Sequence, residues 1–177
     1  MITVRPCNTE AEFAVAGDLI AELGVWDSAE TKKLGLSQQD VLDFYYTKDS
    51  VLPGTNALGP ALMLLGRVGA DVGGCIAYRQ IDPAICELKR LYVRPDFRRT
   101  GLGRTLVSCL ISHARSADYR IMRLETVSFM QRAIDLYEEM GFVRCDPYYD
   151  IPNIFLPITI FMEKDLERSD VVAGKEE

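Results

Sequence analysis

The stretch ELKRLYVRPDFRRTGLGRT, Glu87–Thr105, decides how the rest of the chain is interpreted. It predicts a strand that ends near Val93, then a short loop, then the start of an amphipathic helix. In the loop, Arg98, Gly101 and Gly103 follow the spacing R-x-x-G-x-G. Glycines let backbone N–H groups approach a ligand without a Cβ in the way, and a helix N-terminus attracts negative charge. The stretch therefore predicts a cradle for an anion, and a pyrophosphate fits it.

The charge pattern around this loop supports a small anionic ligand. The chain has a formal net charge of −6, yet residues 87–125 hold nine basic residues and four acidic ones, Glu87, Asp96, Asp118 and Glu125. The basic residues are Lys89, Arg90, Arg94, Arg98, Arg99, Arg104, Arg115, Arg120 and Arg123. A nucleic acid needs a larger basic face, so nucleic-acid binding is not expected. The alternative is that these charges only solvate a strand and a helix.

Length and composition predict one domain over residues 1–166, followed by a polar, frayed tail over 167–177. No apolar run approaches the roughly 20 residues of a membrane span, and the N-terminus lacks a signal-peptide pattern, so a cytoplasmic protein without membrane contact is expected. The five cysteines form no C-x-x-C pair and are interpreted as reduced thiols. With His113 as the single histidine, no metal site is expected.

The N-terminal third predicts a strand and two helices. A strand over residues 2–6 precedes a helix that Asn8 or Thr9 caps and Gly24 ends. Ser37 with Asp40 resembles the cap of a second short helix, over residues 38–46. Residues 47–60 contain two prolines and two glycines and predict a loop.

The remaining segments predict three strands, a helix, a strand, a helix and two last strands. Short apolar runs separated by turns predict strands over 61–68, 73–81 and 86–93, a strand over 120–127, and last strands over 142–144 and 158–163. Gly101 opens a helix whose apolar residues lie three and four apart, namely Leu102, Leu106, Val107, Leu110, Ile111 and Ala114. Ser128 is expected to cap the last helix, which Gly141 stops.

The resulting order is β-α-α-β-β-β-α-β-α-β-β. It predicts an α+β fold in which helices flank a mixed, mainly antiparallel central sheet. One right-handed strand–helix–strand crossover has the glycine loop at its mouth.

A second motif lies thirty residues after Gly103, where Ala133–Phe142 reads AIDLYEEMGF. The chain resembles the GNAT superfamily of acyl-CoA-dependent N-acetyltransferases in the combination of this motif with the R-x-x-G-x-G loop and with Val93-Arg94-Pro95. The resemblance spans about residues 2–166. The runs CELKRLYVRP, LET and PYYDIP are similar to one bacterial-type branch whose members commonly lack an assigned acceptor.

The resemblance implies acetyl-CoA as co-substrate and implies where it binds. Backbone N–H groups of the matching loop would hold the coenzyme A pyrophosphate, and this loop comprises Arg98, Arg99, Thr100, Gly101, Leu102, Gly103 and Arg104. The end of the preceding strand, Leu91, Tyr92 and Val93, would pair with the pantetheine amides. One departure is visible, because many relatives carry an asparagine where this chain has Met130.

The resemblance also implies two catalytic residues. Tyr137 matches the tyrosine beside the coenzyme sulfur and would act as general acid, whereas the alternative is a core aromatic residue beside Leu136. Glu87 matches a strand glutamate that acts as general base in part of the family, and the alternative is a carboxylate paired with Lys89 or an arginine. Glu125 is a second candidate for the base. A base is needed because an alkylammonium must lose a proton before it attacks a thioester.

The implied reaction is direct acetyl transfer to a primary amine, without a covalent intermediate on Cys86 or Cys109. The acceptor is expected to be a small molecule, cationic and amino-acid-like. Aromatic residues expected in its pocket, each also plausible as core, are Trp26, Tyr45, Tyr46, Tyr148 and Tyr149. Two alternatives stay open, a protein or peptide N-acetyltransferase and a module that senses acyl-CoA without turning it over. A homodimer also stays open.

Overall fold

A computed structural model describes residues 1–33, 35–47 and 60–167. The strands are β1 Ile2–Pro6, β2 Ala61–Val68, β3 Asp71–Asp82, β4 Ile85–Val93, β5 Ile121–Val127, β6 Val143–Arg144 and β7 Thr159–Asp165. The helices are α1 Glu10–Lys32, α2 Gln38–Leu42, the π-helical turn η1 Asp43–Thr47, the 3₁₀ turn η2 Pro95–Phe97, α3 Leu102–Ser116 and α4 Gln131–Glu139. Apart from the two short turns, this order is the one predicted from the sequence.

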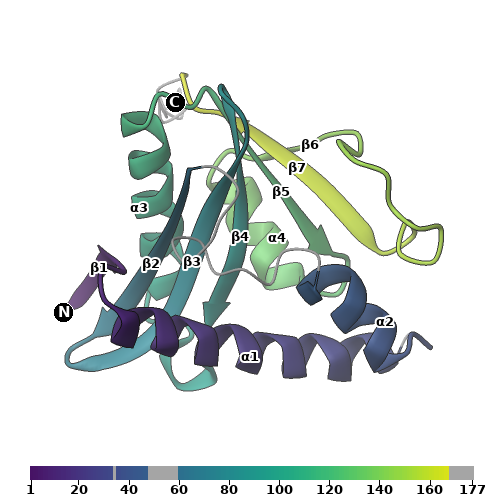
Figure 1. The fold of residues 1–177 in the computed structure, drawn as a ribbon, viewed down its shortest axis with the longest axis horizontal. Helices are drawn as coiled ribbons and strands as arrows, with labels where there is room; N and C mark the ends of the chain where they lie inside the picture. The colour runs from purple at the N-terminus through teal and green to yellow at the C-terminus, as the bar shows by residue number, and fades with distance from the viewer. Residues whose placement is uncertain (34, 48–59, 168–177) are drawn as a thin grey trace, which may run out of the picture.

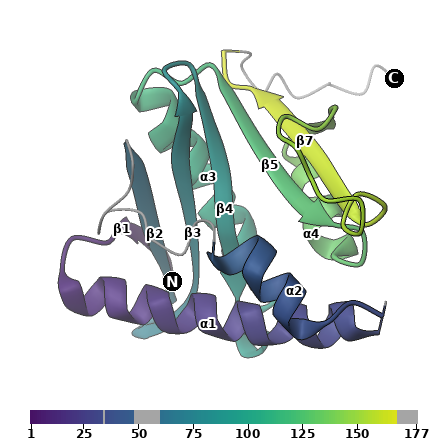
Figure 2. The same ribbon diagram turned by 45° about the vertical axis from the view of Figure 1, so that its right-hand side comes forward.

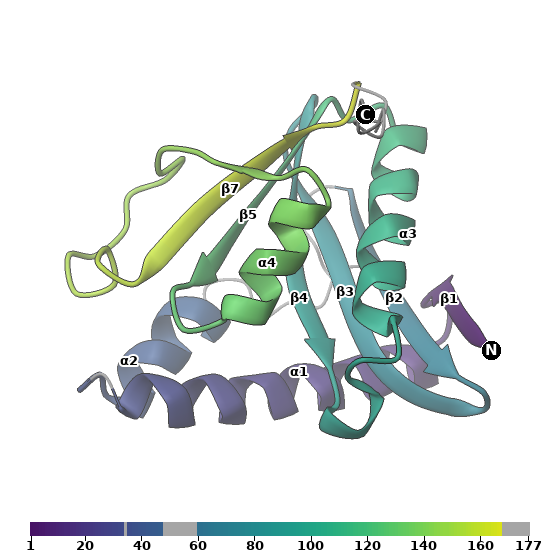
Figure 3. The same ribbon diagram turned by 180° about the vertical axis from the view of Figure 1, so that it is seen from behind.

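The described strands form one seven-stranded sheet in the order β1-β2-β3-β4-β5-β7-β6. Only the pair β4 and β5 is parallel, and the other neighbours run antiparallel. Helices α1 and α2 lie over one face of the sheet, and α3 and α4 over the other (Figures 1 and 3). The predicted α+β class and mainly antiparallel sheet are confirmed.

Helix α3 supplies much of the main core. The six apolar residues predicted for its inner face are all buried, and Leu106, Val107, Leu110 and Ala114 have no exposed surface. They pack against β2, β3 and β4, where glycines allow close approach. A Cβ at Gly66 would lie 2.7 Å from Leu102 Cδ1, and one at Gly73 would lie 2.7 Å from Phe97 Cγ. The strand glycines therefore seat the helix that follows the anion loop.

Helix α1 is longer than predicted. Its start matches, because Thr9 caps it and forms a capping box with Glu12. The predicted stop at Gly24 is wrong, since the helix continues to Lys32. Gly24 and Ser28 are buried on the inner face, and Ser28 Oγ donates to Gly24 O at 2.8 Å. Packing of the neighbouring residues offsets the roughly 1 kcal/mol by which a helical glycine is disfavoured.

Two other predicted boundaries shift. The helix predicted over residues 38–46 is capped by Ser37 as expected, but its second half is the π-helical turn η1. Ser128 does not cap α4, because the helix starts at Gln131 with Met130 at the N-cap position and no side chain bonds its start. Gly141 follows α4 with φ +83°, the left-handed conformation that a glycine stop requires. The predicted 47–60 loop and the tail lie, over residues 48–59 and 168–177, outside the described residues.

Strands β4 and β5 part midway along their length. Their pairing runs from Ile85 with Ile121 to Leu88 with Leu124, although β4 continues to Val93 and β5 to Val127. Figure 2 shows the two strands diverging toward α1 and α2. Each strand leaves the ladder with polar backbone groups that need other partners, so the point of divergence is a natural place for a ligand.

A β-bulge in β4 lies at the same point. Ile76 of β3 stands opposite two residues of β4, because Cys75 pairs with Tyr92 and Ala77 with Lys89. The two residues opposite Ile76 are Arg90 and Leu91. Arg90 has a φ of +61°, in the left-handed region. A bulge leaves a residue unpaired and turns its neighbours, and bulges are frequent beside active sites.

None of the helices in the described part of the chain is both long and apolar enough to cross a membrane. The single domain over residues 1–166 stays a prediction, which the sharing of one sheet by β1 and β7 supports.

Truncation of a fully buried α3 leucine should show how much stability this core provides. Leu110→Ala is expected to lower the free energy of unfolding by about 2–5 kcal/mol, because it removes apolar contacts and leaves a cavity. Chemical denaturation followed by circular dichroism measures the change. The matched control is Leu156→Ala, since Leu156 is 47% exposed and its truncation should change stability by less than about 0.5 kcal/mol. Equal losses in both variants would contradict this description of the core.

Candidate active site

A cleft of about 560 Å³ opens beside the start of α3. Its lining combines the end of β4, the predicted anion loop and the start of α4. The lining residues are Leu23, Trp26, Leu91, Tyr92, Val93, Phe97, Arg98, Arg99, Gly103, Phe129, Met130, Gln131, Arg132, Ala133 and Leu136. Six of the ten residues predicted to bind the co-substrate line this cleft: Leu91, Tyr92, Val93, Arg98, Arg99 and Gly103.

The anion loop has the backbone conformation that its glycines predict. Gly101 has φ +92° and caps α3, and Arg99 has φ +63°. The first main-chain bond of the helix runs from Thr105 N–H to Gly101 O at 3.0 Å. The N–H groups of Gly103 and Arg104 therefore precede the first intrahelical donor, Thr105, and point out of the helix start. Here the positive end of the helix dipole, two bare N–H groups and two arginines meet.

The basic segment does not act as one surface. Only Arg98 and Arg99 of its nine cationic side chains line the large cleft. Arg104 forms an ion pair with Glu139, although its backbone belongs to the helix start. Most of the others pair with acidic side chains or backbone carbonyls elsewhere: Lys89 with Glu125, Arg94 with Glu22, Arg120 with Glu167, Arg123 with Glu163, and Arg115 with Leu166 O. The nine basic residues of the sequence segment 87–125 thus suggested a larger anion site than the structure has, because only two of their side chains line the cleft.

Arg94, which directly follows β4, holds one wall of the cleft in place. Its guanidinium pairs with Glu22 of α1, with Nη2 at 2.6 Å from Oε1, and also donates to Val72 O at 3.1 Å. The bonded guanidinium lowers the pKa of Glu22. Helix α1 is thereby attached to the end of β4, which places Leu23 and Trp26 over the cleft.

A smaller cavity of about 90 Å³ lies where β4 and β5 part. Its lining comes from α1, α2, η1, β4, β5, the loop after β5, and α4: Leu23, Asp27, Thr31, Val41, Tyr45, Leu88, Lys89, Arg90, Leu91, Glu125, Thr126, Val127, Phe129, Met130 and Tyr137. Four residues, Leu23, Leu91, Phe129 and Met130, line both hollows. The cleft and the small cavity are therefore adjacent, and one elongated ligand can reach from the anion loop to the gap between the strands.

Tyr137, the predicted acid, lines the small cavity and not the large cleft. Its ring is 4% exposed and packs edge-on against Phe142, with ring centroids 5.7 Å apart. Burial raises the pKa of its hydroxyl, so the phenol keeps its proton throughout the neutral range. The side chain thus belongs to the core and to the cavity at once.

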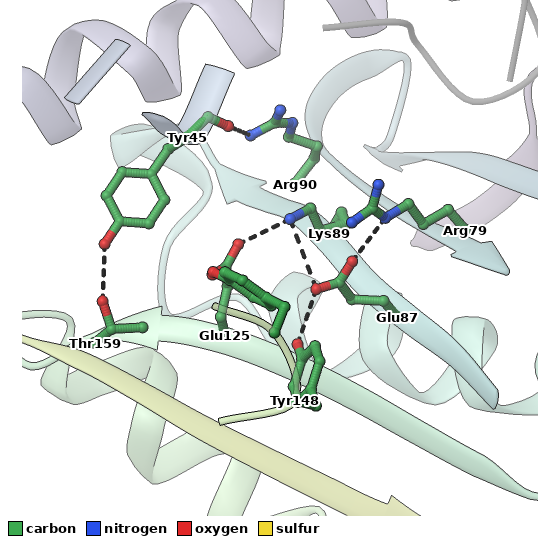
Figure 4. A network of polar contacts seen from close by, with 9 residues as sticks. Tyr45, Arg79, Glu87, Lys89, Arg90, Glu125, Tyr148 and Thr159 are labelled. Carbon is green, nitrogen blue, oxygen red and sulfur yellow. Dashed lines mark hydrogen bonds and ion pairs between the residues drawn. The ribbon is translucent and has the colours of Figure 1, made fainter. Parts of the chain in front are cut away.

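Glu87, the predicted base, is fully buried and does not line either hollow. Figure 4 shows its carboxylate between three partners. Arg79 Nε donates to Oε2 at 2.7 Å, Tyr148 OH donates to Oε1 at 2.8 Å, and Lys89 Nζ lies 3.7 Å from Oε1. Its role as base stays a prediction, and any proton it accepts must reach it through these neighbours.

Glu125, the second candidate for the base, does line the small cavity. Lys89 Nζ donates to its Oε1 at 2.8 Å, and the hydroxyl of Tyr149 donates to its Oε2. Lys89 therefore lies between the two carboxylates and bonds the one that faces the cavity. Two buried carboxylates side by side repel each other and are costly. The Lys89 ammonium between Glu87 and Glu125 offsets this repulsion.

The cysteines near the motif are unsuited to nucleophilic catalysis. All five cysteines have free thiols. Burial raises the pKa of Cys86 to about 12, and burial also raises the pKa of Cys109. Neither thiol is ionised near neutrality, and neither lines the cleft or the cavity.

The predicted aromatic pocket is only partly assembled. Tyr45 lines the small cavity and Trp26 the large cleft, where it lies 6.1 Å from the Phe129 ring. Tyr148 and Tyr149 instead point their hydroxyls at Glu87 and Glu125. The Tyr46 side chain lies outside the described residues.

Sequence reasoning missed several cavity residues, chiefly Asp27, Lys89, Arg90 and Phe129. Asp27 lies in the part of α1 beyond the predicted stop. The Arg90 guanidinium donates to Tyr45 O at 3.0 Å and so ties η1 to the bulge. No local signal marks a bulge at an arginine, whereas the i, i+2 spacing of Glu87 and Lys89 does place both on one face of a strand.

Comparison with known proteins fits this geometry. The family model for the acetyltransferase (GNAT) family matches residues 36–142, more than half of the chain. The chain belongs to this family. An uncharacterised N-acetyltransferase of Schizosaccharomyces pombe is 32% identical over 131 residues, which are 72% of this chain and 78% of that protein. One of Dictyostelium discoideum is 44% identical over 69 residues, 39% of this chain but only 32% of its own length.

Solved structures of GNAT proteins share the fold. A protein described as an acyl-CoA N-acyltransferase from Klebsiella pneumoniae has 30% identity and a TM-score of 0.68, covering 94% of this chain and 98% of that one. YncA of Salmonella typhimurium, whose structure contains acetyl-CoA, has 19% identity and a TM-score of 0.65, covering 96% of each chain. The predicted GNAT membership is confirmed.

The residues present fit an acyl-CoA molecule. A pyrophosphate needs hydrogen-bond donors. The N–H groups at the start of α3 and the side chains of Arg98 and Arg99 are such donors. An extended apolar arm needs a cleft with free strand edge, which Leu91 to Val93 line beyond the last β4–β5 pair. Gly103 leaves room there, since a Cβ would meet only Leu136 at 3.6 Å and Val93 at 3.8 Å.

Substitution of the glycine at the helix start should abolish the anion cradle. Gly101→Asp is expected to raise the Kd for coenzyme A at least about tenfold, because it adds a negative charge at the anion site and strains φ +92°. Isothermal calorimetry measures the affinity. Gly35→Asp is the control, with φ +81°, an exposed site and no lining role. Equal affinity in the two variants would refute the assignment of this loop.

Proposed function

We propose that this protein transfers an acetyl group from acetyl-CoA to the primary amine of a small, amino-acid-like molecule by direct attack. The observation that supports this most is the adjacency of the two hollows. The large cleft starts at an anion-binding helix terminus, and the small cavity holds charged side chains at the point where β4 and β5 part. The four shared lining residues mark where donor and acceptor would meet.

The donor side would be held by the loop and the free strand end. The N–H groups at the start of α3, with Arg98 and Arg99, would bind the pyrophosphate, and the backbone of Leu91, Tyr92 and Val93 would pair with the pantetheine amides. Bound acetyl-CoA supplies an activated thioester. Met130, which lines both hollows, would contact the arm through its thioether, where many relatives use an amide.

Two groups of the chain are suited to stabilise charge during the transfer. A backbone N–H of the Arg90–Leu91 bulge would donate to the thioester oxygen as it gains negative charge. Tyr137 would give a proton to the departing sulfur, because burial keeps its hydroxyl protonated and its side chain lines the cavity. In this direct route, the amine nitrogen bonds the carbonyl carbon as the carbon–sulfur bond breaks.

The base would be a carboxylate of the network in Figure 4. Glu125 reaches the cavity directly, whereas Glu87 would act from behind it through Lys89, which contacts both carboxylates. Either carboxylate would take the proton that the acceptor's ammonium must lose before attack. Proximity of amine and thioester would supply much of the rate enhancement.

The cavity walls favour an acceptor that carries both charges. Asp27 and Glu125 contribute negative charge from α1 and β5, and Lys89 and Arg90 contribute positive charge from β4. A wall of this kind complements a zwitterion, whose ammonium would face the carboxylates and whose carboxylate would face Arg90. The volume of about 90 Å³ admits only the few atoms around the reacting amine.

An acceptor panel tests the proposed reaction. Thiol release from acetyl-CoA is expected with small α-amino acids, with a KM at least about tenfold lower than for the amines that lack the carboxylate. Arg90→Gln should raise the KM for the amino acids and leave that for the decarboxylated amines unchanged. Thiol release only with peptides would favour a protein acetyltransferase. No release above hydrolysis with any amine, despite tight coenzyme binding, would favour a sensing module.

Removal of the Tyr137 hydroxyl tests the acid. Tyr137→Phe should lower kcat by about 10²-fold at every pH tested, because the raised pKa keeps the wild-type hydroxyl protonated over this range, and the coenzyme Kd should not change. Steady-state kinetics across pH 6–10 and calorimetry measure these values. Tyr119→Phe serves as control, because Tyr119 is equally buried, bonds Gln80 and lines neither hollow. Unchanged turnover in Tyr137→Phe at every pH would exclude the role.

A further inference from the structure

Two adjacent tyrosines in the loop between β6 and β7 bond two different carboxylates of the sheet. Tyr148 OH donates to Glu87 on β4, and Tyr149 OH donates to Glu125 on β5. Both rings pack edge-on against Phe161, with centroids 5.1 and 5.3 Å away. Burial first, and then the facing carboxylate, raises the pKa of each hydroxyl, so both remain protonated donors.

The Glu87 carboxylate is part of a row of charges that crosses four strands. Arg79 on β3, Glu87 on β4, Arg123 on β5 and Glu163 on β7 are direct cross-strand partners and alternate in sign. The Tyr148 ring covers this row, with the Arg123 guanidinium carbon 5.2 Å from its centroid. The hydrogen bond between Tyr148 and Glu87 therefore lies inside this packed row of charges.

Glu125 lies one row further toward the divergence of β4 and β5, where the small cavity begins. Its side chain is 12% exposed and lines that cavity, in contrast to Glu87 at 1%. The carboxylate has one bond from each side, Lys89 on Oε1 and Tyr149 on Oε2. These two donors fix its plane while one edge stays open to the cavity.

We propose that Tyr149 is a positioning residue, which holds Glu125 toward the acceptor so that the β6–β7 loop takes part in the reaction. This inference rests on the proposed acetyl transfer, with Glu125 as the group that accepts the ammonium proton. In that step the proton passes from the acceptor nitrogen to Glu125, and the freed lone pair attacks the thioester carbon. Tyr149 keeps its own proton throughout.

The groups that face Glu125 come from several elements. Lys89 and, behind it, Glu87 belong to β4, Tyr45 to η1, and Asp27 to α1. Tyr149 and Tyr148 come from the loop, and Arg123 lies two residues earlier on β5. Among them, Lys89 and Tyr149 donate directly to the carboxylate. Removal of a donor to an ionised carboxylate favours its protonated form, so Glu125 should then titrate at higher pH.

The decisive comparison is Tyr149→Phe with Tyr148→Phe. Each substitution keeps the ring and removes one hydroxyl that donates to a buried carboxylate, so both should lower Tm by about 2–8 °C. Only Tyr149→Phe should move the acidic limb of kcat/KM, upward by about one pH unit, with a roughly tenfold loss below the limb. Calorimetry should give an unchanged coenzyme Kd for both.

A readout that does not need turnover separates this inference from the proposed function. Carbon-13 NMR of side-chain carboxyl groups, with the Glu125 signal assigned by Glu125→Gln, should show the Glu125 titration displaced upward in Tyr149→Phe and unmoved in Tyr148→Phe. An unmoved signal in Tyr149→Phe would overturn the inference even for an active enzyme. A limb moved by Tyr148→Phe alone would overturn it in favour of Glu87. If the Glu125 signal is displaced but the protein acetylates no amine, the result would support the role of Tyr149 in positioning Glu125 and would refute the proposed function.

Discussion

The early end of the β4–β5 ladder is the constraint on which the site depends. The two parallel strands exchange bonds over only four residue pairs and then diverge, and the bulge at Arg90 turns the end of β4 at the same level. Backbone groups in the opening need partners, and side chains from α1, η1 and α4 converge on it. Both hollows lie at this opening, so the geometry of one broken ladder places the anion loop and the charged cavity next to each other.

The second feature is a group of buried charges that the sheet can hold only in combination. Glu87 without exposed surface would be strongly unfavourable alone, but Arg79, Lys89 and Tyr148 satisfy it. Tyr45 adds a further tie, since its hydroxyl shares a hydrogen bond with Thr159 at 2.9 Å and its ring packs on Phe155. The loop before β7 is thereby joined to both the sheet and η1. The side chains proposed to recognise the acceptor and those that hold the buried charges therefore overlap.

Periodicity and turn chemistry predicted the fold well. The α3 stripe, the Thr9 cap, the glycine stop at Gly141 and the order of strands follow from local sequence, because each depends on neighbours within a few residues. The prediction that α1 ends at Gly24 was wrong, because burial of the inner face of α1 outweighs the low helix propensity of glycine. The regular helix predicted over residues 38–46 was wrong in its second half for a similar reason. Contacts with Arg90, Thr159 and Phe155, which are distant in the sequence, stabilise the π-helical turn Asp43–Thr47.

The sequence by itself determined the family and the glycine loop, and it predicted residues that line the large cleft, because these lie in contiguous motifs whose spacing fixes their backbone geometry. Only the tertiary structure decided which carboxylate reaches the cavity. Glu87 and Glu125 lie 38 residues apart in the sequence, and their exposure depends on where β4 and β5 part and on the loop that carries Tyr148 and Tyr149. Distances across a sheet are set by strand order and pairing, which no local pattern encodes.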